Sequence, residues 1–203
     1  MALGIDGPGL SESARLVALP CPASVSESRL VTDPEMNVVK TVARLARQDA
    51  ALLVVDVQEK LLPSIFEEER VRRNTVTMVR AAQILGVPML VTEQYPKGIG
   101  RTAPDVAEAL GAAAAIEKLT FSTFGEPAFV EALGALERRT LVVVGIEAHV
   151  CVTQSVLDAL SAGYEVHVLA DAVSSRTESN WRLGLNRMQQ AGAVVSRTEM
   201  ALF

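Results

Sequence analysis

The chain has 203 residues, of which 49% are hydrophobic, and its formal net charge is −5. This length and composition suit one α/β domain with a sizeable core and argue against a fully disordered chain. The negative charge and the scattered basic residues disfavour a nucleic-acid partner or an anionic membrane surface. No apolar run reaches the roughly 18 residues of a membrane span, so we expect no membrane partner.

The first part of the sequence differs from the rest. Residues 1–35 are rich in Gly, Pro, Ser and Ala without a sustained period, which predicts a mobile extension before a domain at 36–203. No secretory signal is visible up to Pro20. The two cysteines, Cys21 and Cys151, lie in different parts of the chain, so no structural disulfide is expected. These features predict a reducing, cytoplasmic location.

Helical and strand patterns alternate from residue 38 onward. Apolar spacings of three and four with Pro starts and Gly stops predict helices, and short apolar runs predict buried strands. Helices are expected at 38–48, 67–85, 105–110, 127–136, 151–161 and 178–190, and strands at 51–57, 87–92, 114–117, 141–144, 166–170 and 193–195. Segment 95–100, with Pro and Gly, is expected to be a loop. This order predicts an α/β fold of three layers, αβα, in which helices cover both faces of a six-stranded parallel sheet.

Cys151 follows a turn at the end of a predicted strand. The apolar run Leu141–Val144 ends at Gly145, and the helical pattern that follows puts the thiol at or near a helix start. Open parallel sheets keep their sites at the carboxyl ends of strands, and a helix N-terminus favours a thiolate. A thiolate beside free N–H groups of a turn suits acyl transfer. Free cysteines more often have only a packing role. The residues around Cys151 must therefore decide between a catalytic and a structural role.

Asp56 and Lys118 are the expected neighbours, since each comes at the end of another predicted strand and such ends share one edge. The Lys118 ammonium would lower the pKa of the thiol. Asp56 would take the thiol proton and return it to a leaving amine. Singly, such an aspartate is most often a cap or loop residue and such a lysine is most often solvated. The joint pattern favours an active site.

From about residue 50 to residue 199, the sequence resembles the isochorismatase-like cysteine hydrolases, in particular the isochorismatase-domain-containing subfamily. The matching motifs are Leu53–Gln58, Glu117–Lys118 with Phe121–Ser122, Gly145–Val152, Asp171–Ala172 with Ser174–Arg176, and Gly192–Ala193 with Glu199. The resemblance implies a Rossmann-like isochorismatase-like hydrolase fold, a catalytic triad of Asp56, Lys118 and Cys151, and a homo-oligomer of two or more copies.

The resemblance also implies the details of the turn before Cys151. These are a cis peptide bond between Ile146 and Glu147, and an oxyanion hole formed by the backbone N–H groups of Glu147 and Cys151. Nicotinamidases of the family bind metal through Asp and His in the loop after the second strand. This chain has Glu93–Gly98 there, without a histidine. We therefore expect no metal and no cofactor.

The function expected from these residues is hydrolysis of an amide or related C–N bond in a small molecule, through a thioester on Cys151. The pocket walls are expected to come from Gln58, Glu93, Tyr95, Phe121, Phe124 and His149. An exposed place in the turn is an equal alternative for His149. Two other functions stay open: an ether hydrolase that uses Asp56 as acid, and a binding module that kept the fold without turnover.

The C-terminal part of the chain adds a hint of self-association. Its apolar side chains are of the kinds enriched in interface cores. They are Trp181, Leu183, Leu185, Met188, Met200, Leu202 and Phe203. The alternative, that this segment packs on its own sheet, is equally compatible with the sequence.

Overall fold

The computed structural model describes residues 44–203. The extension expected at 1–35 and the first part of the helix expected at 38–48 lie outside these residues. The rest of that helix prediction, 44–48, is wrong, because the chain makes a turn there. The Asp49 N–H donates to the Ala46 carbonyl at 3.0 Å and the Arg138 guanidinium binds the Gln48 carbonyl. These contacts direct the backbone into the first strand.

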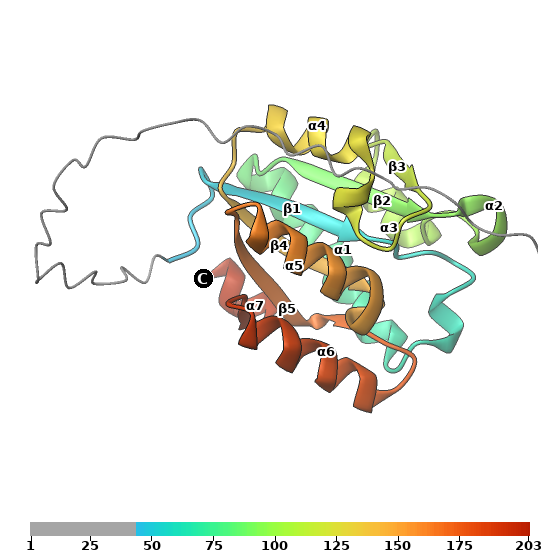
Figure 1. Cartoon of the computed structure of the whole chain (residues 1–203). Coiled ribbons are helices and arrows are strands. Elements are labelled where there is room, and N and C mark those ends of the chain that lie inside the picture. Colours follow the sequence, from blue (N-terminus) through green and yellow to red (C-terminus); the bar gives the residue numbers. More distant parts are fainter. Residues whose placement is uncertain (1–43) are drawn as a thin grey trace, which may run out of the picture. The chain divides into compact units, whose positions relative to one another are not determined.

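Six parallel strands form one sheet, as the sequence predicted, and their order is β3–β2–β1–β4–β5–β6 (Figure 1). The strands are β1 Ala50–Val55, β2 Met89–Gln94, β3 Ala115–Lys118, β4 Thr140–Ile146, β5 Glu165–Ser174 and β6 Val194–Ser196. β5 continues beyond its predicted end at residue 170. It does so because the β4–β5 register shifts between Val143 and Gly145 and pairing then resumes as far as Ser174.

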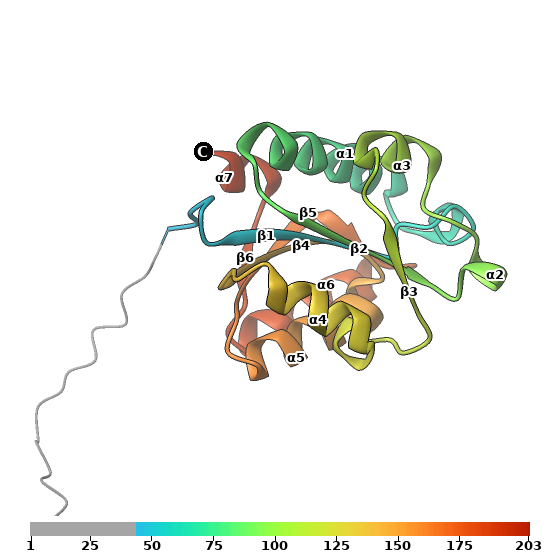
Figure 2. The same ribbon diagram turned by 90° about the horizontal axis from the view of Figure 1, so that it is seen from above.

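Helices cover both faces of this sheet. They are α1 Glu68–Leu85, α2 Pro96–Ile99, α3 Pro104–Leu110, α4 Pro127–Ala135, α5 Thr153–Ser161, α6 Glu178–Gln190 and α7 Thr198–Leu202. Figure 2 shows α1, α3 and α7 on one side and α4, α5 and α6 on the other, which confirms the three layers. The loop expected at 95–100 is wrong in part: Gly98 and Ile99 donate to the Tyr95 carbonyl and close one helical turn after Pro96.

The core lies on both faces because side chains alternate along a strand. In β1, Leu52 and Val54 join the cluster under α1 and α3, whereas Leu53 and Val55 join the cluster under α4, α5 and α6. Every residue of β1 is buried. This double burial explains why the sequence of β1 is a continuous apolar run.

The strand order reverses at β1: β2 and β3 are added on one side of β1, and β4, β5 and β6 are added on the other. Ligand sites of open parallel sheets lie at such a point, beyond the carboxyl ends of the strands. Gly145 lets β4 approach β1 closely there: its φ is 120°, and a Cβ atom would lie 2.0 Å from the Val55 carbonyl oxygen. Asp56, Lys118 and the turn after β4 therefore meet at one edge.

The C-terminal apolar residues divide into two groups. Trp181 packs internally, with its ring 6.2 Å from that of Phe66, the Arg70 guanidinium over it, and its Nε1–H donating to the Ala170 carbonyl. Leu185 and Met188 are also buried in the domain. Leu202 is partly buried and packs against the core, and the exposed members are Leu183, Met200 and Phe203.

Candidate active site

Asp56 is the first residue after β1, and its carboxylate is fully buried. The backbone turns sharply there, with a φ of 51°, and the Asp56 N–H donates to the Thr92 carbonyl of β2. Each carboxylate oxygen accepts one hydrogen bond from another strand, Oδ1 from the Thr92 hydroxyl of β2 at 2.8 Å and Oδ2 from the Lys118 ammonium of β3 at 2.6 Å. The pair neutralises two charges that could not be buried singly.

Lys118 is the last residue of β3, and its side chain is as deeply buried as that of Asp56. Its ammonium has three further oxygens within hydrogen-bond distance. Gln94 Oε1 lies at 3.0 Å, the Phe121 carbonyl at 3.1 Å and the Thr120 carbonyl at 3.2 Å. An ammonium group has three donors, so this cage satisfies the cation completely and fixes it beside Asp56.

Cys151 lies in a π-helical turn, Ala148–Val152, that leads into α5, and only 8% of the residue is exposed. Burial, the larger effect, and the Asp56 charge raise the pKa of its thiol, the Lys118 charge lowers it, and the net result is a pKa of about 12. The structure therefore brings Asp56, Lys118 and Cys151 together. The Lys118 ammonium lowers the pKa of the thiol, as expected, but burial outweighs this effect. In the free protein, the thiol is neutral near pH 7.

The turn before Cys151 contains a cis peptide bond between Ile146 and Glu147. Within residues 44–203, the Glu147 N–H donates to no backbone carbonyl. The Glu147 carboxylate instead accepts from the backbone N–H of Arg176 at 3.1 Å and from its Nε at 3.0 Å. The side chain of Glu147 is thus tied to the chain after β5, while its N–H stays available at the edge of the sheet.

Gln58, which we expected to line the pocket, is fully buried and braces the backbone. Its amide NH₂ donates to the carbonyls of Gln94 at 3.0 Å and Gly100 at 2.6 Å, and its amide oxygen accepts from the Gln94 N–H at 2.7 Å. These contacts join the end of β2 to the chain beyond α2. They give Gln58 a bracing role in place of the expected substrate contact.

Glu93, another expected pocket residue, is also engaged within the protein. Its Oε1 accepts from the N–H and the hydroxyl of Thr102, and its Oε2 accepts from Arg101 at 2.8 Å. Burial alone would raise the pKa of Glu93, but the hydrogen bonds from Arg101 and Thr102 outweigh burial and hold the pKa below its ordinary value. Glu93 is therefore an ionised carboxylate with both oxygens occupied.

The three expected aromatic residues lie in different surroundings. Tyr95 and Phe121 each contact Lys118 through the backbone, while the two residues are 50% and 54% exposed. Phe124 is half-buried and packs against the core, with its ring 5.4 Å from that of Phe129 and 6.1 Å from that of Tyr164. Tyr95 and Phe121 remain candidates for the wall of a site, whereas Phe124 serves the core.

His149 is half-buried in the turn of Cys151, between the two places that the sequence left open. Its Nδ1 lies 3.0 Å from the Ser175 hydroxyl, and its backbone N–H donates to the same oxygen at 3.4 Å. This double contact ties the turn to the end of β5.

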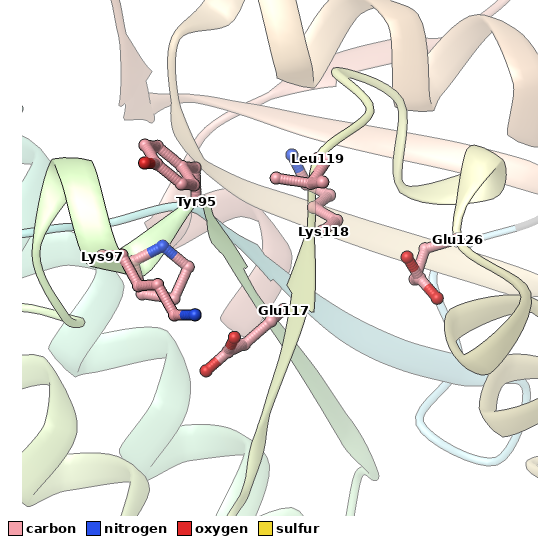
Figure 3. Close-up of a pocket in the computed structure, with 7 residues that line it drawn as sticks. Tyr95, Lys97, Glu117, Lys118, Leu119 and Glu126 are labelled. Atoms are coloured by element: carbon pink, nitrogen blue, oxygen red, sulfur yellow. The ribbon is translucent and has the colours of Figure 1, made fainter.

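A hollow of about 260 Å³ lies beside the edge strand β3 (Figure 3). Its lining residues are Tyr95, Pro96, Lys97, Glu117, Lys118, Leu119 and Glu126. In Figure 3, Tyr95 and Lys97 stand on one side of the hollow, Glu117 lies on the strand with Leu119 just after its end, and Glu126 lies beyond it. Neither Asp56 nor Cys151 belongs to this lining, so the hollow adjoins the buried charges without containing the thiol.

Sequence reasoning missed Thr92 and Gln94, the two side chains of β2 that contact Asp56 and Lys118. β2 lies between β1 and β3, with Thr92 level with Val55 and Gln94 level with Lys118. Thr92 directly precedes the segment Glu93–Gly98, which lacks a histidine, and Gln94 lies within it. The strand order β3–β2–β1 would have pointed to them.

Comparison with known proteins assigns the chain to a family. The model of the isochorismatase domain matches residues 50–200. Isochorismatase domain-containing protein 2 of Danio rerio is 36% identical over 162 residues, which cover 79% of this chain and 81% of that protein. The match and the fold define an isochorismatase-like α/β protein. This chain belongs to the isochorismatase family, whose membership indicates a hydrolase.

Solved structures show the same fold. The MAR1 ribonuclease of Caenorhabditis elegans is 38% identical, with a TM-score of 0.75 over 79% of this chain and 82% of that chain. YcaC of Pseudomonas aeruginosa, with hexane-2,5-diol and covalent acrylamide, and YcaC of Escherichia coli, described as an octameric hydrolase of unknown specificity, are each 27% identical. Each has a TM-score of 0.76 over 80% of this chain and 82% of the other.

Within residues 44–203, no group of three or more His, Cys, Asp or Glu side chains is placed to hold a metal ion. Over the same residues, no helix has the length and apolar character to cross a membrane.

Proposed function

We propose that this protein is a metal-independent cysteine hydrolase that cleaves an amide or related C–N bond in a small molecule. The observation that carries the proposal is the position of Cys151, whose thiol pKa responds both to the Asp56 carboxylate and to the Lys118 ammonium bound to it. The three side chains are buried, which suits a small substrate that displaces water from the site.

The reaction needs Asp56 as base and then as acid. Asp56 takes the Cys151 proton while the sulfur forms a bond to the substrate carbonyl carbon. The resulting oxyanion is held by the N–H groups of Glu147 and Cys151. When the C–N bond breaks, Asp56 returns the proton to the leaving nitrogen, and a thioester remains.

Hydrolysis of the thioester repeats this use of Asp56. A water molecule gives one proton to Asp56 and adds to the thioester carbonyl, the C–S bond breaks, and the proton returns to the sulfur. The products are a carboxylic acid and an amine or ammonia. Lys118 holds the Asp56 carboxylate in place by its hydrogen bond at 2.6 Å and offsets part of the charge on the sulfur.

The family comparison supports the presence of a reactive nucleophile. YcaC of Pseudomonas aeruginosa was solved with covalent acrylamide, and the Escherichia coli protein is described as a hydrolase. The octameric state of that relative supports the expectation that this chain assembles into a homo-oligomer. A cytoplasmic location remains a prediction from the sequence.

A screen of small amides, ureides and carbamates tests the proposal. We expect the wild-type protein to release the amine or ammonia from at least one compound, Cys151→Ala to release none, and EDTA to change nothing. Rapid quenching should show an acyl adduct on the peptide that contains Cys151. Turnover retained in Cys151→Ala and lost in Asp56→Asn would overturn the proposal in favour of an ether hydrolase with Asp56 as acid.

Two other outcomes would also overturn it. Compounds that bind without turnover would identify a binding module. Single-stranded RNA belongs in the screen, because a relative 38% identical to this chain is described as a ribonuclease. The net charge of −5 does not favour a polyanionic substrate, so we expect no cleavage of RNA.

A further inference from the structure

Two of the four oxygens around the Lys118 ammonium are main-chain carbonyls, those of Thr120 and Phe121. A main-chain carbonyl can hold its position only if its loop is held. The chain after β3 has no regular structure until the 3₁₀ turn Thr123–Gly125. The position of the cation therefore depends on whatever fixes the segment 119–123.

This segment is fixed from α5. The Ser122 hydroxyl donates to Asp158 Oδ2 at 2.5 Å, and the Thr123 N–H donates to the Ser155 hydroxyl at 2.9 Å. Within the segment, the Thr120 hydroxyl donates to the Ser122 carbonyl at 2.8 Å. Hydrogen bonds that involve a carboxylate are short and strong. Ser155 and Asp158 thus clamp the segment whose carbonyls hold the ammonium.

The same helix leads away from the nucleophile. Ser155 and Asp158 follow Cys151 by four and seven residues, a spacing that puts side chains on one side of a helix. The thiol of Cys151 lies at one end of this face. Ser155 follows about one turn further on, and Asp158 about two turns further on. The clamp links the position of the cation to the position of the thiol.

We propose that Ser155 and Asp158 are positioning residues that hold the Lys118 ammonium in register with Asp56 and Cys151. This proposal rests on the proposed function, because the clamp affects catalysis only if Lys118 and Cys151 act as proposed above. Neither residue contacts a reacting atom, and each acts through the loop. Lys118 reaches Asp56 from the edge strand, so a loosened loop would let the ammonium leave its cage.

Exchange of the Lys118 ammonium protons with water, followed by NMR, tests the clamp directly. Lys118→Met assigns the signal in the wild-type spectrum. We expect faster exchange in Ser155→Ala and in Asp158→Ala, by about fivefold, the effect of losing one ordinary hydrogen bond. Asp158→Asn should restore slow exchange, because its amide oxygen still accepts from Ser122.

Ser161→Ala is the matched control. Ser161 is exposed on α5, and its hydroxyl donates to the Leu157 carbonyl of the same helix at 2.8 Å. Unchanged exchange in both test variants, or an equal change in Ser161→Ala, would overturn the proposal. Should Ser155→Ala not fold, Asp158→Ala decides alone, since Asp158 lies at the surface.

The exchange measurement needs no substrate, so its failure is distinct from failure of the proposed function. When a substrate is known, Asp158→Ala should lower kcat and leave KM unchanged, because the clamp acts on the catalytic cation. A rise in KM with kcat unchanged would contradict the assignment and make the segment a substrate-binding loop.

Discussion

Cys151 illustrates how burial and charge compete at a single residue. Burial is the largest effect, the Asp56 charge acts in the same direction, the Lys118 charge acts against both, and together they give a thiol pKa of about 12. In the mechanism that we propose, the reactive form of the sulfur is therefore made during the reaction, by proton transfer to Asp56. This arrangement protects the thiol from unwanted alkylation and oxidation between turnovers.

Asp56→Asn separates reactivity from turnover. The change removes the negative charge that raises the pKa of the thiol, so we expect faster reaction of Cys151 with iodoacetamide at pH 8, about tenfold for each unit by which the pKa falls. Turnover should nevertheless vanish, because no group accepts the proton. Asp49→Asn, in the turn before β1, is the control. Labelling that is unchanged or slower in Asp56→Asn would contradict this account.

The raised pKa also makes stability depend on alkaline pH. The native thiol keeps its proton up to about pH 12, whereas a thiol at its ordinary value titrates at 9.0. Between pH 9.0 and about pH 12 the native state binds more protons than the unfolded state. The stabilisation that the thiol gives the native state is therefore complete below pH 9.0 and is lost as the pH rises to about 12. The free energy of unfolding should fall by up to about 1.4 kcal/mol per pH unit in this window.

Urea unfolding at pH 8 and pH 10 measures this effect. We expect the wild-type protein to lose more stability between the two pH values than Cys151→Ala, which lacks the titrating group. The difference between the two proteins removes the contribution of the other groups that titrate at alkaline pH. An equal loss in both proteins would show that the native thiol has an ordinary pKa.

At the scale of elements, the turn that carries Cys151 is held by a close contact with α6. A Cβ atom on Gly184 of α6 would lie 2.8 Å from the Ala148 carbonyl oxygen and 3.0 Å from the His149 nitrogen. A side chain at residue 184 would therefore push the helix and the turn apart. The Thr153 hydroxyl braces the same turn by donating to the Ala148 carbonyl at 2.6 Å.

Gly184→Ala should damage the site more than its small size suggests. We expect the melting temperature to fall and turnover to drop, because overpacking costs about 1–3 kcal/mol and the displaced element carries the nucleophile. Gly134→Ala is the matched control: Gly134 lies inside α4 with open space around it. That change should stabilise the protein by about 0.5–1 kcal/mol. A neutral Gly184→Ala would show that α6 tolerates the shift.

The sequence predicted the position of the candidate active site better than it predicted the residues that line the pocket. The carboxyl ends of parallel strands share an edge, so Asp56, Lys118 and Cys151 could be placed together from strand patterns alone. Gln58 and Glu93 have the polarity of pocket residues, but sequence does not show that backbone and Arg101 partners occupy them. The partners of Ser155 and Asp158 lie more than thirty positions earlier in the chain, which no local pattern reveals.

At the scale of the whole molecule, we expect an oligomer. The exposed apolar side chains include Tyr95, Leu119 and Phe121 beside β3, and Leu183, Met200 and Phe203 towards the C-terminus. Burial of such side chains would favour association. Sedimentation at micromolar concentration should show a mass well above the 21.7 kDa of one chain. A species at the monomer mass that persists as the concentration rises would contradict this expectation.

The buried pair of Asp56 and Lys118 has a consequence for how this protein can evolve. Removing one partner of such a pair leaves an uncompensated charge and costs about 3–5 kcal/mol, whereas replacing both with apolar residues can cost little. A lineage that abandoned the chemistry would therefore have to change two distant codons almost at once. A substitution of Asp56 alone or of Lys118 alone would be selected against because it destabilises the protein, even where selection on activity had ended. The pair can thus outlast the function that it serves.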